Sequence, residues 1–376
     1  MGSDNEYDST GKGSEQVSLM DGTSMKSIWR SILNLRSKEY IQIVVFFMLG
    51  GASVLLTKSI AKVVPLETTT KAFEFPAGIE NNIGNFVSPL TKLDTAIYWH
   101  IPKASGSSMK NYYGCMGLVT ASQVGLDGHE QDTSLQIVER FQGQKFVNVD
   151  TTKLEGIARA KKLGFAQSQW ADIAFTPFPK NLADIFTPRH KGRFFALFRH
   201  PVDRAVSLFS HRSKASWEKK EGVYMPELQE IGLENYLKEE HGNFLVDNGG
   251  YMVSLILDKD RITPLTEADI RAAKEILRVK FLVGLTSRIE ESVERFDRYF
   301  GWSNMREREQ CGDKFIHGGK NVGSYEKLEE GSDIWNTIAE ALAPDIQLYE
   351  YAVQLFEEQR QYFPNLSHSQ VGDNVN

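Results

Sequence analysis

Residues 193–209 read RFFALFRHPVDRAVSLF, and this stretch decides the class of fold. Its first six residues are almost wholly apolar, which is typical of a central parallel strand covered on both faces. Pro201 then stands where the first turn of a helix tolerates proline. The apolar positions after it recur at helical spacing, at Val202, Ala205, Val206 and Phe209. A buried strand that leads directly into an amphipathic helix predicts an α/β unit.

A second stretch with the same plan lies about a hundred residues earlier. Residues 96–101 read AIYWHI and predict a strand, and residues 103–108 read KASGSS, a lysine followed by small and hydroxyl residues that open a helix. Further strands are predicted at 145–150 and 281–285. Helices are predicted over 152–163, from a capping box at Thr266 and Asp269, over 289–300, and over 334–362 with an interruption near Pro344. Strands that alternate with helices favour a mainly parallel sheet.

The N-terminal part predicts a membrane anchor. Residues 1–39 are polar and predict a disordered cytosolic tail, and residues 41–57 are apolar. That length is near the lower limit of about 17 residues for crossing a bilayer. A buried core helix or a cleaved signal peptide is disfavoured. We therefore expect a transmembrane signal-anchor at 40–58, a stem at 59–90, one folded domain at 91–365 and a tail at 366–376.

Composition restricts the partners. The 376 residues carry a formal net charge of −6, so nothing global indicates nucleic-acid binding. The two cysteines, Cys115 and Cys311, fit no zinc spacing. An oxidising lumen would allow them to pair, but buried free thiols are the favoured expectation. The sequence does not indicate the oligomeric state.

The two strand–helix junctions together predict a site for an anion held at two ends. Backbone N–H groups at the start of the first helix, with Lys103, suit a phosphate-like group. Arg199 can hold a second one bidentately, with Ser207 about two turns into the second helix. Each junction alone is equally compatible with a structural turn, or with surface pairing of Arg199 or Arg204 with Asp203. No Gly-Lys-Ser/Thr occurs, so a Walker A loop is not predicted.

These segments resemble the PAPS-dependent sulfotransferases, particularly the membrane-bound carbohydrate type. Residues 103–108 match the family loop for the 5′-phosphosulfate, and Arg199, Pro201 and Ser207 match its 3′-phosphate segment. Residues 247–252, 281–288 and 321–325 resemble its acceptor-side region, late strand and nucleotide-covering loop. The resemblance covers about residues 93–360.

The resemblance implies a P-loop-like α/β sandwich with a central, mainly parallel sheet flanked by helices, behind an N-terminal membrane anchor. It implies sulfuryl transfer from PAPS, leaving PAP, to a hydroxyl or amine of a glycan or glycoconjugate, without a metal, in a type II Golgi membrane protein with a luminal domain. Lys103 would act on the leaving oxygen. The residues implied for donor binding are Lys103, Ala104, Ser105, Gly106, Ser107, Ser108, Arg199 and Ser207.

The acceptor base is open. Some family members place a histidine about two dozen residues before the arginine, but residues 172–179 contain none. Asp172 and His129, the latter beside Glu130, are the first candidates. Further options are His190, His200 and His211.

Acceptor specificity is expected in loops around 111–190 and 212–250, where Trp170, Trp217 and Tyr251 are candidates for stacking on sugars. Residues 365–367 form a glycosylation sequon. Two alternative functions remain: a nucleotide kinase or NTPase of related fold, and a catalytically silent glycan-binding protein.

Overall fold

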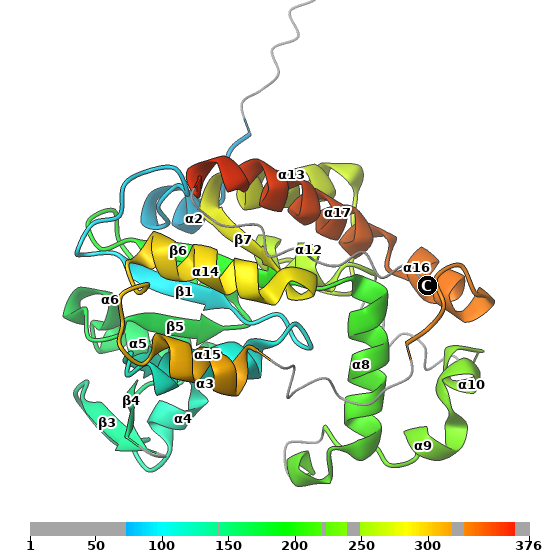
Figure 1. Ribbon diagram of the computed structural model, residues 1–376, viewed down its shortest axis with the longest axis horizontal. Helices are drawn as coiled ribbons and strands as arrows, with labels where there is room; N and C mark the ends of the chain where they lie inside the picture. The colour runs from blue at the N-terminus through cyan, green and yellow to red at the C-terminus, as the bar shows by residue number, and fades with distance from the viewer. Residues whose placement is uncertain (1–72, 141–142, 220–222, 239–248, 318–326, 365–376) are drawn as a thin grey trace, which may run out of the picture. The chain divides into compact units, whose positions relative to one another are not determined.

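The computed structural model describes residues 73–140, 143–219, 223–238, 249–317 and 327–364. The chain divides into two units, residues 1–70 and 71–376, and every described residue belongs to the second (Figure 1). The predicted cytosolic tail, the anchor at 40–58, the first part of the stem and the tail at 366–376 lie outside the described residues. In the described part of the chain, no helix is both long and apolar enough to cross a membrane.

The second unit is an α/β fold built on one seven-stranded sheet. The strand order is β3-β4-β2-β5-β1-β6-β7, and every neighbouring pair is parallel except the antiparallel β3–β4 pair. The strands are β1 Thr95–Trp99, β2 Thr120–Ala121, β3 Ile137–Arg140, β4 Gln144–Val147, β5 Ile173–Thr176, β6 Gly192–Phe198 and β7 Phe281–Leu285.

Helices cover both faces of this sheet, and a third group of helices lies beyond the carboxyl ends of the strands (Figure 1). One face packs against α3 Gly106–Cys115, α14 Ile289–Phe300 and α15 Arg308–Phe315. The other face packs against α2 Ala77–Asn82, α5 Leu154–Lys162, α6 Phe165–Ser168, α7 Pro179–Ala183, α12 Tyr251–Leu257, α13 Glu267–Lys280 and α17 Ala343–Glu358. The third group is α8 Pro201–Lys214, α9 Leu228–Ile231, α10 Leu233–Lys238 and α16 Asp333–Ala341. A short α4, Gln123–Leu126, follows β2, and 3-10 turns occupy Ser216–Glu218, Thr286–Arg288 and Gln359–Tyr362.

The apolar run of β6 explains why helices cover both faces of the sheet. All seven residues of β6 are buried. Phe194 and Phe198 pack into the cluster on one face, whereas Phe195 and Leu197 pack into the cluster on the other. Because side chains alternate between the two faces of a strand, an uninterrupted apolar run requires helices on both sides.

The strand order creates a switch point between β1 and β6. From β1 the chain continues through α3 to β2, on one side, whereas from β6 it continues to β7, on the other. In open α/β sheets, ligands collect beyond the carboxyl ends of the strands at such a point. The two predicted anion-binding junctions, at residues 103–108 and 199–207, follow these two strands.

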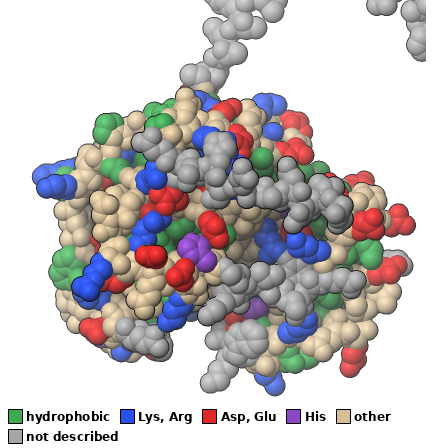
Figure 2. Space-filling model, viewed as in Figure 1, with side chains coloured by type: hydrophobic (Ala, Val, Ile, Leu, Met, Phe, Trp, Pro, Cys, Tyr) green, Lys and Arg blue, Asp and Glu red, His purple; other side chains and the backbone are tan. Residues whose placement is uncertain are grey.

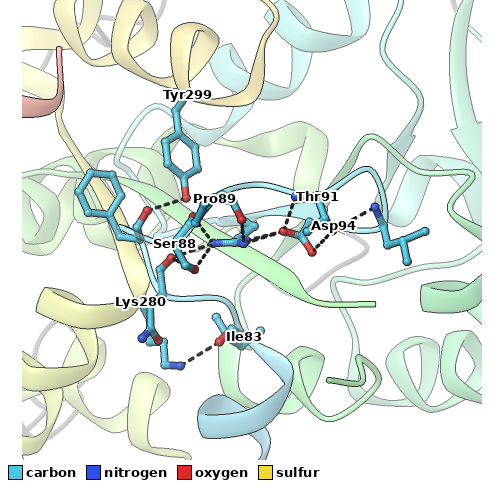
Figure 3. A network of polar contacts seen from close by, with 11 residues as sticks. Ile83, Ser88, Pro89, Thr91, Asp94, Lys280 and Tyr299 are labelled. Atoms are coloured by element: carbon cyan, nitrogen blue, oxygen red, sulfur yellow. Dashed lines mark hydrogen bonds and ion pairs between the residues drawn. The ribbon is translucent and has the colours of Figure 1, made fainter. Parts of the chain in front are cut away.

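The expected stem reaches too far along the chain. Ile79 and Ile83 belong to the main hydrophobic cluster, so the folded domain begins well before residue 91. Figure 3 shows the polar contacts that tie this segment to the sheet. The buried Arg193 side chain donates to Asp94 and to the carbonyl oxygens of Asn85, Ser88 and Pro89.

Two further contacts fasten the same segment. Lys280 Nζ donates to the carbonyl oxygen of Ile83 at 2.8 Å, and the Tyr299 hydroxyl donates to that of Phe86 at 2.9 Å (Figure 3). These partners lie about 200 residues away in sequence, so residues 73–90 by themselves do not indicate that they are folded onto the sheet.

The expectation of free cysteines is also wrong. Cys115, at the end of α3, and Cys311, in α15, form a disulfide with a Cα–Cα distance of 5.8 Å. Both helices pack on the same face of the sheet, which brings together two residues 196 positions apart. The prediction of free thiols rested on the tendency of cysteines to be buried, and a buried disulfide satisfies that tendency equally well.

Candidate functional site

The loop between β1 and α3 has a strained backbone. Lys103 and Ser105 both adopt left-handed conformations, with φ of 64° and 62°. A residue with a Cβ pays about 1–2 kcal/mol for such a conformation, and strain of this kind gathers at functional sites. Ser105 makes no side-chain capping bond to α3. The N–H groups in the first turn of a helix lack carbonyl partners within that helix, so the start of α3 at Gly106 suits an anion.

His100 supports this loop from within. A Cβ on Gly106 would lie 2.0 Å from the His100 ring, so only glycine fits where α3 begins. Burial, together with the charges of Lys110 and Lys103, lowers the pKa of His100 to about 4. His100 is therefore a neutral packing group at pH 7.

Two arginines from the second junction hold the loop in place. Arg199 Nη1 donates to the carbonyl oxygen of Lys103 at 3.0 Å. Arg204 Nε donates to that of Pro102 at 3.1 Å, and its guanidinium also pairs with the buried Asp345 at 3.5 Å. The KASGSS loop and the RHP segment, expected to lie close together, are thus in direct contact across neighbouring strands.

The site is rich in positive charge. Burial lowers the pKa of Lys103, the nearby Glu218 carboxylate raises it, and Arg199 lowers it again. Burial likewise lowers the pKa values of Arg199 and Lys110. Among the described residues, no carboxylate lies within 4.0 Å of the Lys103 or Lys110 ammonium groups. A bound anion would offset these burial costs.

Figure 2 shows lysine and arginine side chains beside the hollow next to α8. Lys110, which sequence reasoning missed, belongs to the same neighbourhood because its charge acts on His100. Its position one turn into the helix that opens from the loop was the signal that could have identified it.

The remaining residues predicted to bind the sulfuryl donor differ in their exposure to solvent. Ser107 is exposed, and Ser105 is partly buried. Ser108 and Ser207 are 6 % and 7 % exposed. Ser105, Ser107 and Ser108 lie at the start of α3 and Ser207 lies two turns into α8, so these hydroxyls are accessible to different degrees as neutral hydrogen-bond donors. Ala104 has a different role: its side chain is in the core and its N–H donates to Ile101 O at 3.2 Å.

Asp172, a candidate base, lies at the amino ends of the strands, at the opposite side of the sheet from Lys103 and Arg199. It precedes β5, so it stands at the amino end of that parallel strand, whereas Lys103 and Arg199 follow the carboxyl ends of β1 and β6. Its carboxylate accepts from Val119 N at 2.7 Å, and burial raises its pKa. With Arg193 and Trp302 it lines a separate pocket of about 240 Å³. Because strand β5 was not predicted from the sequence, the position of Asp172 at the amino end of this strand could not be predicted either.

His129, the other first candidate, lies on the loop after α4. Its Nδ1 is 2.7 Å from Asp132 Oδ2, and its carbonyl oxygen accepts from Arg159. In the described structure, no hydrogen bond or ion pair links His129 to Lys103 or Arg199.

The other three histidines have distinct surroundings. His190 precedes β6, at the amino edge, and lies near Thr187. His200 packs between the rings of Trp335 and Tyr349. His211, on α8, has its Nε2 3.0 Å from Glu218 Oε2.

In the part of the chain that is described, no group of three or more His, Cys, Asp or Glu side chains could hold a metal ion. Residues 239–248, which include the start of the predicted acceptor-side region, and the predicted covering loop at 321–325 lie outside the described residues.

Comparison with models of protein families yields no match for this chain, and comparison with curated proteins yields none either. The functional assignment therefore rests on the residues and geometry of the site.

Proposed function

We propose that this protein is a PAPS-dependent sulfotransferase that moves a sulfuryl group to a hydroxyl or amine of a glycan or glycoconjugate. The observation that carries the proposal is the hydrogen bond of Arg199 to the Lys103 carbonyl at the switch point between β1 and β6. It joins two cationic segments, each suited to one phosphate-like group. PAPS is a ligand with two such groups, the 5′-phosphosulfate and the 3′-phosphate.

Each residue has a role in this proposal. The start of α3, with Ser105, Ser107 and Ser108, holds the 5′-phosphate and sulfuryl oxygens. Lys103 neutralises the charge that grows on the bridging oxygen as the S–O bond breaks. Arg199 and Ser207 hold the 3′-phosphate, which distinguishes PAPS from ATP.

Titration calorimetry with PAP tests donor recognition. The full-length protein in detergent, without magnesium, is expected to bind PAP more tightly than ATP or ADP. Arg199→Ala should weaken PAP binding by roughly 10- to 100-fold, because a hydrogen bond to a charged group is lost. Arg278→Ala is the matched control, since Arg278 is exposed on α13 and pairs with Glu275. Magnesium-dependent preference for ATP would instead indicate the nucleotide kinase or NTPase.

One observation favours a second candidate, a catalytically silent glycan-binding protein. Neither first-choice base, Asp172 or His129, contacts the Lys103 loop. PAP binding without turnover of PAPS would support this function.

The proposal includes a type II orientation in the Golgi membrane, with residues 71–376 in the lumen. The Cys115–Cys311 disulfide supports it, because disulfides persist in oxidising compartments. Protease treatment of sealed Golgi vesicles tests it: the folded domain should be protected until detergent is added.

A further inference from the structure

The proposed transfer requires a base that faces Lys103, and α8 supplies a candidate. The helix begins directly after Arg199 and carries Ser207, which belongs to the proposed donor site. His211 lies four residues beyond Ser207, so the two side chains share a face of α8, about 6 Å apart. Its side chain is 23 % exposed.

The chain turns back after α8 and brings a carboxylate to His211. Ala215 N donates to the His211 carbonyl oxygen at 2.8 Å, and Glu218 N donates to the Ala215 carbonyl oxygen at 2.9 Å. This turn places Glu218 Oε2 3.0 Å from His211 Nε2. A carboxylate on one ring nitrogen fixes the orientation of the imidazole and favours its uptake of a proton.

The same carboxylate connects the pair to Lys103. Of the charged groups that act on Lys103, Glu218 has the largest effect. His211 lies on the helix that follows Arg199 and carries Ser207, and Glu218, in the turn after that helix, is near enough to Lys103 for its charge to act on the amine assigned to the leaving oxygen.

The other histidines are less suitable. His100 packs against Gly106 at the start of α3, His200 packs between two aromatic rings, and His190 lies at the opposite edge of the sheet.

We propose that His211 is the general base of the transfer and that Glu218 is the residue that positions it. This inference rests on the proposed sulfotransferase function. The His211 imidazole takes the proton of the acceptor hydroxyl while the acceptor oxygen bonds to sulfur. The bond from sulfur to the bridging oxygen breaks, its electron pair stays on the phosphate of PAP, and Lys103 stabilises that charge.

The experiment uses the full-length protein and two readouts. Calorimetry measures PAP binding, and labelled PAPS measures both transfer to heparosan and chondroitin oligosaccharides and slow transfer to water, which needs no known acceptor. His211→Ala should lower the rate of PAP release by roughly 100- to 10,000-fold, since that is the usual contribution of a general base. PAP affinity should stay unchanged, and added imidazole should restore part of the rate.

Glu218→Gln tests the positioning role. It should lower kcat and leave the KM for PAPS unchanged, and Glu218→Asp should recover part of the loss. The control is His317→Ala, because His317 forms a comparable pair with Asp313, 2.9 Å away on α15. His129→Ala tests the rival pair with Asp132.

The outcomes are separable. Full activity of His211→Ala, loss in His129→Ala instead, or PAP binding by the wild type without any PAP release would overturn the assignment of the base. Failure of the wild type to bind PAP would overturn the sulfotransferase function itself.

Discussion

At the scale of single residues, the site combines a strained loop with a neutral histidine beneath it. His100 is in contact with Gly106 and close to two lysines, so a charge on its ring would be both buried and repelled. The loop that carries Lys103 thus depends on the protonation state of a residue that takes no part in the proposed chemistry.

Acid should destabilise the fold through His100. Its pKa is about 4 in the folded protein and near 6.5 when unfolded, so between these values the unfolded chain binds a proton that the folded chain does not. The free energy of unfolding should therefore fall as pH drops from 6.5 to 4, by roughly 3 kcal/mol from this group. Urea unfolding across this range measures the slope. His100→Asn should flatten it, and an equal slope in both proteins would contradict this prediction.

Lys103→Ala should separate turnover from binding. The variant lacks the ammonium group that stabilises the leaving oxygen, so kcat is expected to fall by about 100- to 1,000-fold. Much of the PAP affinity should remain, because Arg199, Ser207 and the start of α3 still bind PAP. Turnover of labelled PAPS and calorimetry with PAP measure the two effects. Lys92→Ala, at an exposed lysine on the opposite edge, is the control. Unchanged turnover in Lys103→Ala would exclude the assigned role.

At the scale of elements, the start of α3 is set by one close contact. Gly106 and Gly114 lie at the two ends of this helix, but their surroundings differ. A Cβ at Gly106 meets the ring of His100 at 2.0 Å, whereas a Cβ at Gly114 meets the end of the Gln144 side chain at 3.0 Å. The end of the flexible Gln144 side chain can move a few tenths of an ångström, whereas the overlap with the His100 ring is a full ångström closer.

Gly106→Ala should therefore destabilise the fold by about 1–3 kcal/mol and weaken PAP binding, because the loop must shift. Gly114→Ala, in the same helix, should be neutral or gain up to about 1 kcal/mol from helix propensity. Thermal unfolding and calorimetry compare the two variants. Equal behaviour would show that the contact with His100 does not set the loop.

Elements with strong local patterns were predictable. Strands β1, β4, β6 and β7 and helices α5, α8 and α14 lie where apolar runs or helical periodicity indicated, and the capping box of Thr266 and Asp269 is confirmed. Strands β2, β3 and β5 were not predicted. They have two to four residues each, and β3 has polar, partly exposed positions. Their pairing with neighbours, rather than their own composition, makes them strands.

At the scale of the whole domain, the disulfide joins α3 to α15 across 196 residues of chain. Closing so long a loop restricts the unfolded chain, and the chain-entropy model assigns it about 5 kcal/mol. The disulfide also anchors the end of α3 remote from the Lys103 loop.

The double variant Cys115→Ser/Cys311→Ser should unfold at a markedly lower temperature than the wild type. Dithiothreitol should lower the Tm of the wild type and leave the double variant unchanged, as thermal scans with and without reductant will measure. A wild-type Tm that does not respond to reductant, together with two thiols titrated in the unfolded protein, would show that the cysteines are free.

The sequence by itself determined the features that depend on neighbouring residues: the buried runs of β1 and β6, the helices after them, and the lysine- and arginine-bearing junctions. Only the tertiary structure decided that β1 pairs with β6, so that Arg199 contacts the Lys103 carbonyl. It also decided that Asp172 lies at the opposite edge, that Cys115 meets Cys311, and that Glu218 returns to His211. Local patterns record burial and periodicity, but strand order arises from pairing between distant segments, which no short stretch of sequence encodes.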